Sequence, residues 1–569
     1  MQKYTRLFVD KISSDFDPSK DFVLGPWCLK DSFTLNKINE FSAKGVFLKN
    51  KTADTMKAYK CCEDQHARIV QKVAKYVQSI NKNKYSLDFY KDYISHWLIE
   101  FIHYTHFSKR LINECIIKFN DYNLELILLH KPKKIIFNNY NDFAFKRTEK
   151  LDFFSSFLLF LLIENKPKRW KISYYNIKET NNDNREIFEN SNNYFLKFGN
   201  FLRRCLAPRV KTVYGLNFFE KIFISLVLLF KKPIREKTFR KNYYSNIDQD
   251  YIEPPISDDN LFQLIKKLLP INYKEIYKKK EKFTNCDGKI MLCSAPSLYN
   301  DISDEKFDLL MFKEKKGKIY SVQHGACYGD LFYRLSPMEY GFDKFISWGH
   351  KKHQNYDIDF QPLPSPQFKI NYKENSSQNI LFVSTGTYYF VPKYVDMFSF
   401  DDTISRVNDT ISFLDELDVK FLEKIKYKNL NRGHFSEKEI LKEKFKSLQF
   451  INTIPEKNIN KSKLIVQNHN GTPFYKSLAA NAPTICFWRK DCWALTDKAL
   501  ELHDNLHNAG ILFYNPKLAA QKLKEVWPNI TDWWQSGKVQ DARRKFCDEF
   551  ANKDAKWFSV WIKYLWGAR

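Results

Sequence analysis

A histidine with glycine neighbours stands at the end of an expected strand in the segment Ser321–Gly329 (SVQHGACYG). At such a position His324 can donate to an anion or act as an acid or base. A buried histidine bonded to a backbone carbonyl is the structural alternative. Five of the 16 glycines fall between Gly317 and Gly349, so the backbone here needs conformations that other residues avoid. We therefore predict a functional role for His324.

A second segment, Val466–Pro473 (VQNHNGTP), follows an apolar run and precedes an expected helix that contains Ser477. Free backbone N–H groups at a helix start, together with a hydroxyl, can hold a phosphate. Thr472 is expected to be the N-cap, and Pro473 suits the first helical turn. An ordinary capped helix would need no special residue beyond Thr472. The strand–turn–helix order favours a phosphate site at Asn470–Thr472.

Carboxylates near the histidine segment could supply a nucleophile or a general base; they are Asp301, Asp304, Glu339 and Asp343. We take Asp304 and Glu339 as the candidates, although surface Asp and Glu are common. His503 and His507 lie one helical turn apart, but without a third ligand the pair is more typical of a solvated face than of a metal site. We expect neither a metal ion nor a cofactor.

From Lys289 onward, short strand-like runs alternate with helical stretches, which is typical of a parallel α/β sheet. The alternation restarts after a Pro-containing polar stretch, so we predict two facing Rossmann-like domains with a ligand between them at the carboxyl ends of the strands. The first expected domain covers residues 1–375. It contains helical insertions at about 87–282, an α/β core at 289–350 and a linker at 357–378. A nucleotide-binding domain at 376–545 and a C-terminal helix at 546–569 follow.

The composition is that of a folded chain with large cores: 44% of the residues are hydrophobic and 17% are aromatic. The apolar runs Phe153–Ile163 and Ile222–Phe230 are shorter than the roughly 20 residues of a spanning helix, and the N-terminus lacks an apolar stretch of signal-peptide length. The 11 cysteines form no CxxC pair, which indicates free thiols in a reducing cytosol. We predict a cytoplasmic protein.

The formal net charge of +26 is compatible with nucleic acid, an anionic membrane surface or acidic small molecules as partners. Basic residues concentrate at Lys231–Lys241 and Lys266–Lys282, and the first cluster follows the apolar run that ends at Phe230. Such a segment suits a helix in the headgroup region of an inner membrane; a core helix followed by a solvated loop is the alternative. No nucleic-acid motif occurs, so nucleic acid is not expected.

Several distinctive motifs lie near both ends of the chain and throughout its second half. They are FVLGPWC, YSLDFYKDYISHWL, YSVQHGACYGD, FISWGH, LPSPQ, NHNGTPFYKSLAANAPTICFW and DWWQSGKVQDARRKF. Together they resemble a family of bacterial surface-polysaccharide (O-antigen) transferases, whereas residues 111–280 carry little of the likeness. The strand–NHNGT–helix–NAPT unit is also similar to capsule-type Kdo transferases.

This resemblance implies a GT-B glycosyltransferase at the cytoplasmic face, with CMP-Kdo or a related CMP-ulosonic acid as donor. The chain departs from the family pattern at Ala326-Cys327, where more glycine is expected, and at Lys476, where a Glu is common. Besides His324, the positions that the resemblance assigns to nucleotide or phosphate binding are Gln323, Gly325, Tyr328, Gly329, Asn470, Gly471, Thr472 and Ser477.

The function predicted first is therefore sugar transfer from a nucleotide donor to a lipid-linked or oligosaccharide acceptor in O-antigen, capsule or lipopolysaccharide synthesis. Peripheral contact with an anionic inner membrane stays open. Two alternatives remain: a nucleotide-sugar epimerase or hydrolase of the same fold, and a non-catalytic basic protein that binds membrane or nucleic acid.

Overall fold

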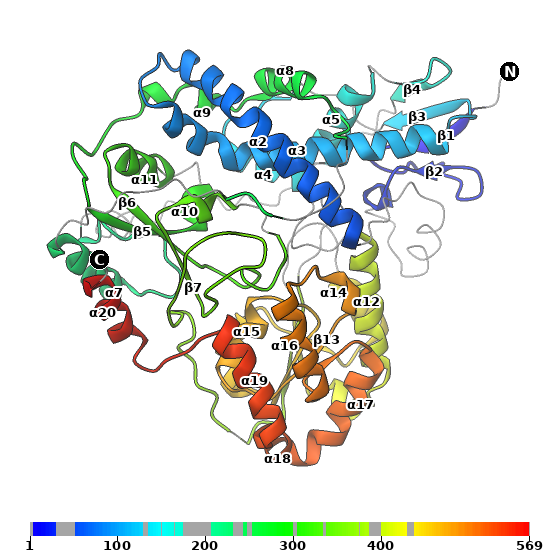
Figure 1. Ribbon diagram of the computed structural model, residues 1–569. Coiled ribbons are helices and arrows are strands. Elements are labelled where there is room, and N and C mark those ends of the chain that lie inside the picture. Colours follow the sequence, from blue (N-terminus) through cyan, green and yellow to red (C-terminus); the bar gives the residue numbers. More distant parts are fainter. Residues whose placement is uncertain are drawn as a thin grey trace.

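Three parallel β-sheets with helices packed around them make up the described part of the chain (Figure 1). The α/β class and the two facing sheet units expected of a GT-B-like fold are confirmed. The computed structural model describes residues 4–29, 52–128, 135–149, 151–163, 166–174, 206–231, 243–246, 253–299, 304–333, 337–374, 376–385, 400–429 and 437–567.

The C-terminal sheet has six strands in the order β11-β10-β9-β12-β13-β14. The chain runs outward from β9 to one edge, returns to β12 and then runs to the other edge. The order therefore reverses between β9 and β12, where open α/β sheets bind ligands. The strands are β9 (Ile380–Val383), β10 (Ile425–Lys428), β11 (Gln449–Phe450), β12 (Leu464–Gln467), β13 (Thr484–Phe487) and β14 (Leu512–Phe513).

A four-stranded sheet in the order β5-β6-β7-β8 forms the core of the N-terminal unit. Every residue of β5 and β6 is buried, as expected for parallel strands that are covered on both faces. The apolar runs KIMLCS and KIYSV therefore form strands, as predicted. The strands are β5 (Ile290–Ser294), β6 (Lys318–Val322), β7 (Lys344–Ser347) and β8 (Phe360–Pro362).

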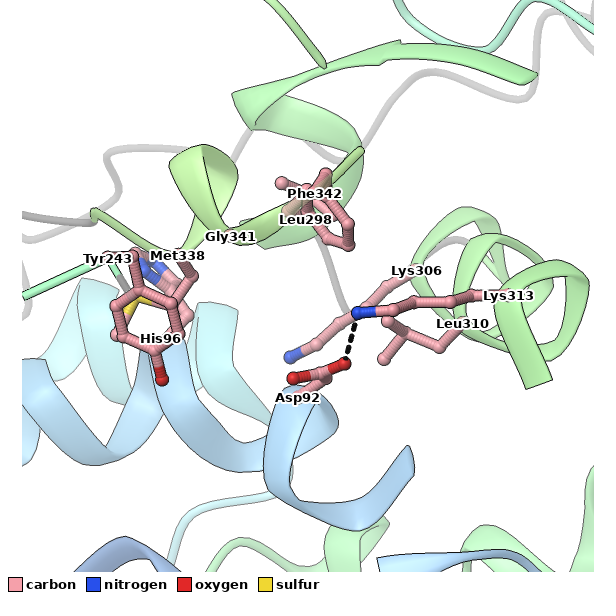
Figure 2. A pocket seen from close by; sticks show the side chains of 10 residues that line it. All are labelled: Asp92, His96, Tyr243, Leu298, Lys306, Leu310, Lys313, Met338, Gly341 and Phe342. Carbon is pink, nitrogen blue, oxygen red and sulfur yellow. Dashed lines mark hydrogen bonds and ion pairs between the residues drawn. The ribbon is translucent and has the colours of Figure 1, made fainter. Parts of the chain in front are cut away.

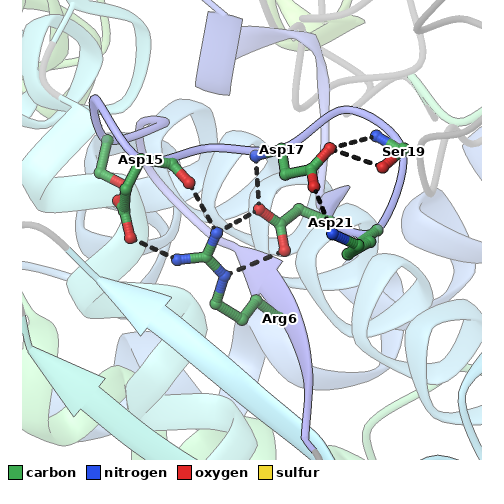
Figure 3. Close-up of polar contacts among 7 residues, drawn as sticks. Arg6, Asp15, Asp17, Ser19 and Asp21 are labelled. Carbon is green, nitrogen blue, oxygen red and sulfur yellow. Dashed lines mark hydrogen bonds and ion pairs between the residues drawn. The ribbon is translucent and has the colours of Figure 1, made fainter.

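A second four-stranded parallel sheet, in the order β2-β1-β3-β4, lies at the N-terminus. Sequence reasoning predicted helical insertions at about 87–282, the region in which β3 and β4 lie. Arg6 on β1 holds the following loop by donating to Asp15 (2.6 Å) and Asp21 (2.9 Å), and these hydrogen bonds raise the guanidinium pKa (Figure 3). The strands are β1 (Thr5–Phe8), β2 (Phe22–Val23), β3 (Leu124–Leu128) and β4 (Lys171–Tyr174).

Two long antiparallel helices, α2 (Thr52–Ile80) and α3 (Leu87–Lys118), cross the N-terminal unit (Figure 1). Tyr93, Trp97 and Phe101 of α3 are buried, and their spacing of four residues places them on one face of the helix. The other helices of this unit are α4 (Tyr140–Glu149), α5 (Leu151–Ile163), α7 (Phe218–Phe230), α8 (Asp258–Leu268), α9 (Ile271–Lys274), α10 (Ala295–Tyr299), α11 (Glu305–Glu314) and the short 3-10 helix η3 (Pro337–Gly341).

Helices cover the C-terminal sheet, and the last helix, α20, returns to the N-terminal unit beside α7 (Figure 1). There the Trp561 indole donates to the Pro364 carbonyl (2.8 Å), and Lys231 donates to the Leu565 carbonyl (2.7 Å). The helices are α12 (Phe400–Asp415), α13 (Val419–Leu422), α14 (Glu437–Lys444), α15 (Thr472–Ala479), α16 (Asp497–Asn508), α17 (Pro516–Val526), α18 (Ile530–Gln535), α19 (Gly537–Phe550) and α20 (Trp557–Gly567).

The polypeptide passes between the two units at residues 363–379 and again at 551–556. These two segments lie side by side, because the Ser365 amide donates to the Asn552 carbonyl (3.0 Å). Lys553 also donates to Asn371 Oδ1 (2.7 Å). The stretch 357–378, predicted to be a linker, includes β8 before it leaves the N-terminal sheet.

Candidate active site

The two loops singled out in the sequence meet between the units. The Ala326 amide, just after His324, donates to the Thr472 hydroxyl (3.1 Å). The Cys327 thiol donates to the Asn470 carbonyl (3.6 Å), and Cys327 has a positive φ of 67°. The first loop follows β6 and the second follows β12, so the carboxyl ends of the two sheets face each other at this contact.

His324 belongs to a hydrogen-bonded chain of three side chains. Its Nδ1 bonds to the Tyr328 hydroxyl, which donates to Glu339 Oε2 (3.1 Å). Because the Tyr328 hydroxyl donates its single proton to Glu339, Nδ1 is the donor in the bond between His324 and Tyr328. Nε2 is then the ring's acceptor, as in a general base oriented by a carboxylate. Glu339 is fully buried and acts on His324 through Tyr328.

Asp330 joins the two units from the end of the histidine loop. Its Oδ2 accepts from Asn470 Nδ2 (2.8 Å) and from the Tyr475 hydroxyl (2.5 Å). Its backbone carbonyl accepts from the Thr496 amide (2.8 Å). Burial first, and the nearby Asp330 charge second, raise the pKa of Tyr475, so this hydroxyl stays protonated as a donor.

The other predicted residues of the first loop shape its backbone. Gln323 accepts from the Trp348 amide and donates to the Gly325 carbonyl (both 2.8 Å), so its side chain ties the loop to β7. A Cβ at Gly325 would lie 3.2 Å from the Thr472 hydroxyl. At Gly329 a Cβ would lie 2.7 Å from the His350 ring, so only glycine allows this packing.

The second loop has the predicted strand–turn–helix form, with one correction. Gly471, and not Thr472, is the N-cap of α15, and its φ of −158° is extended. The Thr472 hydroxyl serves the contact between the units instead. Asn470 Oδ1 is buried and has no hydrogen-bond partner among the described residues. Ser477 accepts from Gln467 and donates to the Pro473 carbonyl (both 2.9 Å), so it fastens α15 to β12.

A pocket opens at the point where the strand order of the C-terminal sheet reverses. Its lining comes from α12, from the loop after β12 and from the segment after β13. Asn468 donates to Ser384 (3.1 Å) at the end of β9 and to Thr410 (2.9 Å). The lining residues are Arg406, Asp409, Asn468, Phe487, Trp488, Arg489 and Cys492.

Charged side chains of both signs line this pocket: Arg406, Arg489 and Asp409. Arg406 is buried, donates to Ser384 (2.7 Å) and pairs with Glu437 (3.2 Å). Arg489 donates to Ser405 (3.2 Å) and is more exposed. Burial lowers the pKa of the adjacent His469 to about 3, and the Arg406 charge adds to the shift, so that ring is neutral. The two guanidinium groups are the parts of this lining that can bind an anion such as a phosphate.

The carboxylates predicted near the histidine differ in position. Asp304 is exposed at the start of α11, where it pairs with Lys279 (2.8 Å). Asp343 accepts from the Ile319 amide (2.8 Å), and burial raises its pKa. Asp301 lies outside the described residues. Of the two chosen candidates, the described contacts link only Glu339 to His324.

A separate cavity lies inside the N-terminal unit, between α3 and α11 (Figure 2). Lys313 pairs there with Asp92 (2.9 Å), and the Lys306 side chain reaches toward the same carboxylate. Met338 and Gly341 of η3 line the cavity, whereas Glu339 of the same turn is bonded to Tyr328. The packing of this cavity therefore supports the element that carries Glu339.

Sequence reasoning missed Asp330, Tyr475 and the arginine pocket. A buried arginine is unusual, but nothing local to Arg406 shows that it is buried. The partners of Asp330 lie 140 and 145 residues away in the chain, so no spacing rule connects them.

The two parallel sheets present their carboxyl ends to each other, and this is the edge at which α/β proteins bind their ligands. Residues 5–565 match the LIC12162 family transferase model, and the chain belongs to that family. An enzyme, and not a non-catalytic binding protein, is therefore the correct alternative. No curated protein matches the sequence.

Solved structures are similar only at a distance. Acinetobacter baumannii MurG shares 10% identity over 57% of this chain and 84% of that one, with a TM-score of 0.29. An E. coli trehalose-6-phosphate protein bound with UDP-2-fluoro glucose shares 9% over 79% and 94% (TM-score 0.28). WaaG, a glycosyltransferase involved in lipopolysaccharide biosynthesis, shares 9% over 57% and 85% (TM-score 0.24).

Proposed function

We propose that this transferase is a glycosyltransferase of bacterial surface-polysaccharide synthesis. It would transfer a sugar from a nucleotide donor to a glycan acceptor that is an oligosaccharide or is linked to lipid. The observation that carries the proposal is the Ala326–Thr472 hydrogen bond (3.1 Å), because it brings the histidine loop against the expected phosphate loop. A donor and an acceptor held at those two loops would meet at His324.

The donor nucleotide is proposed to occupy the pocket with Arg406 and Arg489, with its phosphate toward Asn470–Thr472. Two arginines, the Thr472 amide at the start of α15 and the Thr472 hydroxyl can balance phosphate charge. These groups supply the positive field that a leaving nucleotide needs, so we propose neither a metal ion nor a cofactor. The motif resemblance favours a CMP-ulosonic acid such as CMP-Kdo.

In the proposed reaction the acceptor hydroxyl oxygen attacks the anomeric carbon of the donor sugar. The bond from that carbon to the phosphate oxygen breaks, and its electron pair leaves with the nucleotide. His324 Nε2 takes the proton of the attacking hydroxyl. Tyr328 and Glu339 hold the ring in this orientation and stabilise the imidazolium. Gln323, Gly325 and Gly329 keep the loop in place.

Thermal unfolding with CMP, UDP, GDP and ADP tests the donor part of the proposal. A selective rise in melting temperature with CMP supports the CMP donor, whereas selective stabilisation by another nucleotide refutes it. Asn470→Ala should reduce the nucleotide response, because it removes a buried amide of the phosphate loop.

Product analysis tests the reaction. With donor and acceptor glycan present, the wild-type protein should form a glycosidic bond, and His324→Ala should not, although its melting temperature should match that of the wild type. Full activity of His324→Ala would remove the histidine from the mechanism. Conversion of the donor to an epimer or free sugar, with the acceptor unused, would favour an epimerase or hydrolase of this fold.

A further inference from the structure

Helix α7 exposes a continuous apolar face. Phe219, Phe223, Leu226 and Phe230 follow one another at spacings of four, three and four residues, so they share one side of the helix. Their exposed fractions are 77%, 50%, 42% and 75%. The opposite side packs into the N-terminal unit through Ile224, Val227 and Leu228. Most of the apolar side chains of α7 are thus not needed for its packing.

The apolar face continues onto α20. The Phe223 and Phe558 rings are in contact (centroids 5.6 Å apart), and Trp566 at the end of α20 is 61% exposed. Large exposed apolar patches on a folded protein mark interaction surfaces. We refer to Phe219, Phe223, Leu226, Phe230 and Trp566 as the α7–α20 face.

Charge indicates what covers the α7–α20 face. The sequence Lys231–Lys241 (KKPIREKTFRK) begins directly after Phe230 and contains six Lys or Arg residues and one Glu. Only Lys231 of this run lies within the described residues. An apolar helix followed by a basic run is the pattern of a helix lying in the interface of an anionic bilayer. At 13 residues, α7 is about 20 Å long, too short to cross the hydrocarbon core.

The start of α7 lies close to the candidate active site. The Tyr214 ring is 6.1 Å from the His324 ring, and it precedes α7 by a few residues. In the first turn of α7, Glu220 pairs with Lys369 (2.8 Å). Two residues before Lys369 in the chain, Gln367 donates to the His324 carbonyl (2.9 Å). A surface in contact with the α7–α20 face is therefore also near the mouth of the site.

We propose that the α7–α20 face is a membrane-binding surface, which lies in the headgroup region of a bilayer that contains anionic lipid. In this position it brings the site of His324 to acceptors anchored in the same bilayer. The statement that the site reaches anchored acceptors rests on the proposed glycosyl transfer. The assignment of the membrane-binding surface is independent of it. Among the described helices, none has the length and apolar character of a spanning segment.

Vesicle sedimentation tests the surface directly. The full chain should bind vesicles of phosphatidylcholine mixed with phosphatidylglycerol, bind pure phosphatidylcholine more weakly, and lose affinity as salt is raised. The double variant Phe219→Glu/Phe230→Glu should bind the mixed vesicles about tenfold or more weakly, because it replaces two inserting rings by anions. Both side chains are largely exposed, so folding should be unaffected.

A matched control is Val419→Glu/Leu518→Glu, which places two charges at exposed apolar positions of the C-terminal unit. It should bind vesicles like the wild type. Equal binding by wild type and Phe219→Glu/Phe230→Glu would overturn the proposal. So would a wild-type dimer that dissociates in this variant while neither protein binds vesicles, because the face would then join two copies of the chain.

The same variant separates this proposal from the proposed function. Its nucleotide-dependent stabilisation should equal that of the wild type, since the arginine pocket lies in the other unit. Loss of vesicle binding with an intact nucleotide response supports the membrane surface. A wild-type protein that binds vesicles but no nucleotide contradicts only the proposed glycosyl transfer from a nucleotide donor.

Discussion

Replacing Asp330 by Ala should weaken the contact between the two units and, with it, nucleotide binding. Asp330 is buried and accepts from Asn470 (2.8 Å) and Tyr475 (2.5 Å). Without its carboxylate both donors stay buried with no acceptor in that position. The loss of each such bond costs about 1–3 kcal/mol, so the total is about 2–6 kcal/mol.

Part of this free energy holds Asn470 in place and part holds the units together. If about 2 kcal/mol falls on the arrangement that binds nucleotide, the affinity decreases about 30-fold. The assay is the nucleotide concentration that produces half of the maximal rise in melting temperature, together with the urea midpoint of the free protein. The nucleotide used is the one that stabilises the wild-type protein most.

Two variants calibrate this experiment. Tyr475→Phe removes one donor but retains the Asn470–Asp330 bond, so it should cost about half as much as Asp330→Ala. Asp415→Ala removes an exposed carboxylate that pairs with Lys444 (2.6 Å) and should cost less than about 1 kcal/mol. If Asp330→Ala resembles Asp415→Ala in both measurements, the assigned role of Asp330 is wrong.

The remaining predictions concern single residues. Tyr328→Phe should lower kcat about 10–100-fold with little change in KM, since it breaks the link between His324 and Glu339; an unchanged kcat would argue against the chain. Gly349→Ala should lower the melting temperature by several degrees, because its φ is +145° and a Cβ would lie 2.5 Å from the Asp548 carbonyl; an unchanged value would contradict this close approach. Burial lowers the pKa of His503 in the folded protein to about 4. As the pH falls below the ordinary value of about 6.5, the histidine is protonated in the unfolded chain but not in the folded protein. The free energy of unfolding therefore decreases as the pH falls. Between about pH 7.5 and 5.5 the urea-derived stability of His503→Leu should fall about 1.4 kcal/mol less than that of the wild type; identical slopes would refute this.

The sheet strands could be predicted because their sequences carry the signal of complete burial. The runs at β9, β12 and β13 are short, apolar and bounded by polar turns, and every one of their residues is buried. β1 to β4 were largely missed, since they are separated by long helices and one of them, β4, is only half-buried. Their pairing depends on contacts between distant segments, which periodicity does not encode.

The candidate site could be predicted in part. Histidine, glycine and asparagine at strand ends identified both loops, and their meeting is confirmed by the Ala326–Thr472 hydrogen bond. The role of Thr472 as an N-cap was wrong, because its hydroxyl bonds across the units instead. Arg406 lies in α12, and its buried ion pair is made with Glu437 from a later segment. Side chains that act between the two units can be identified only when the positions of the sheets are known.

The two crossings at 363–379 and 551–556 join the units at one place, where they are hydrogen-bonded to each other. Asp330 joins the units at a second place, through its bonds to Asn470 and Tyr475. Loss of the Asp330 carboxylate is therefore expected to loosen the loops after β6 and β12 from each other while the covalent crossings keep the units attached.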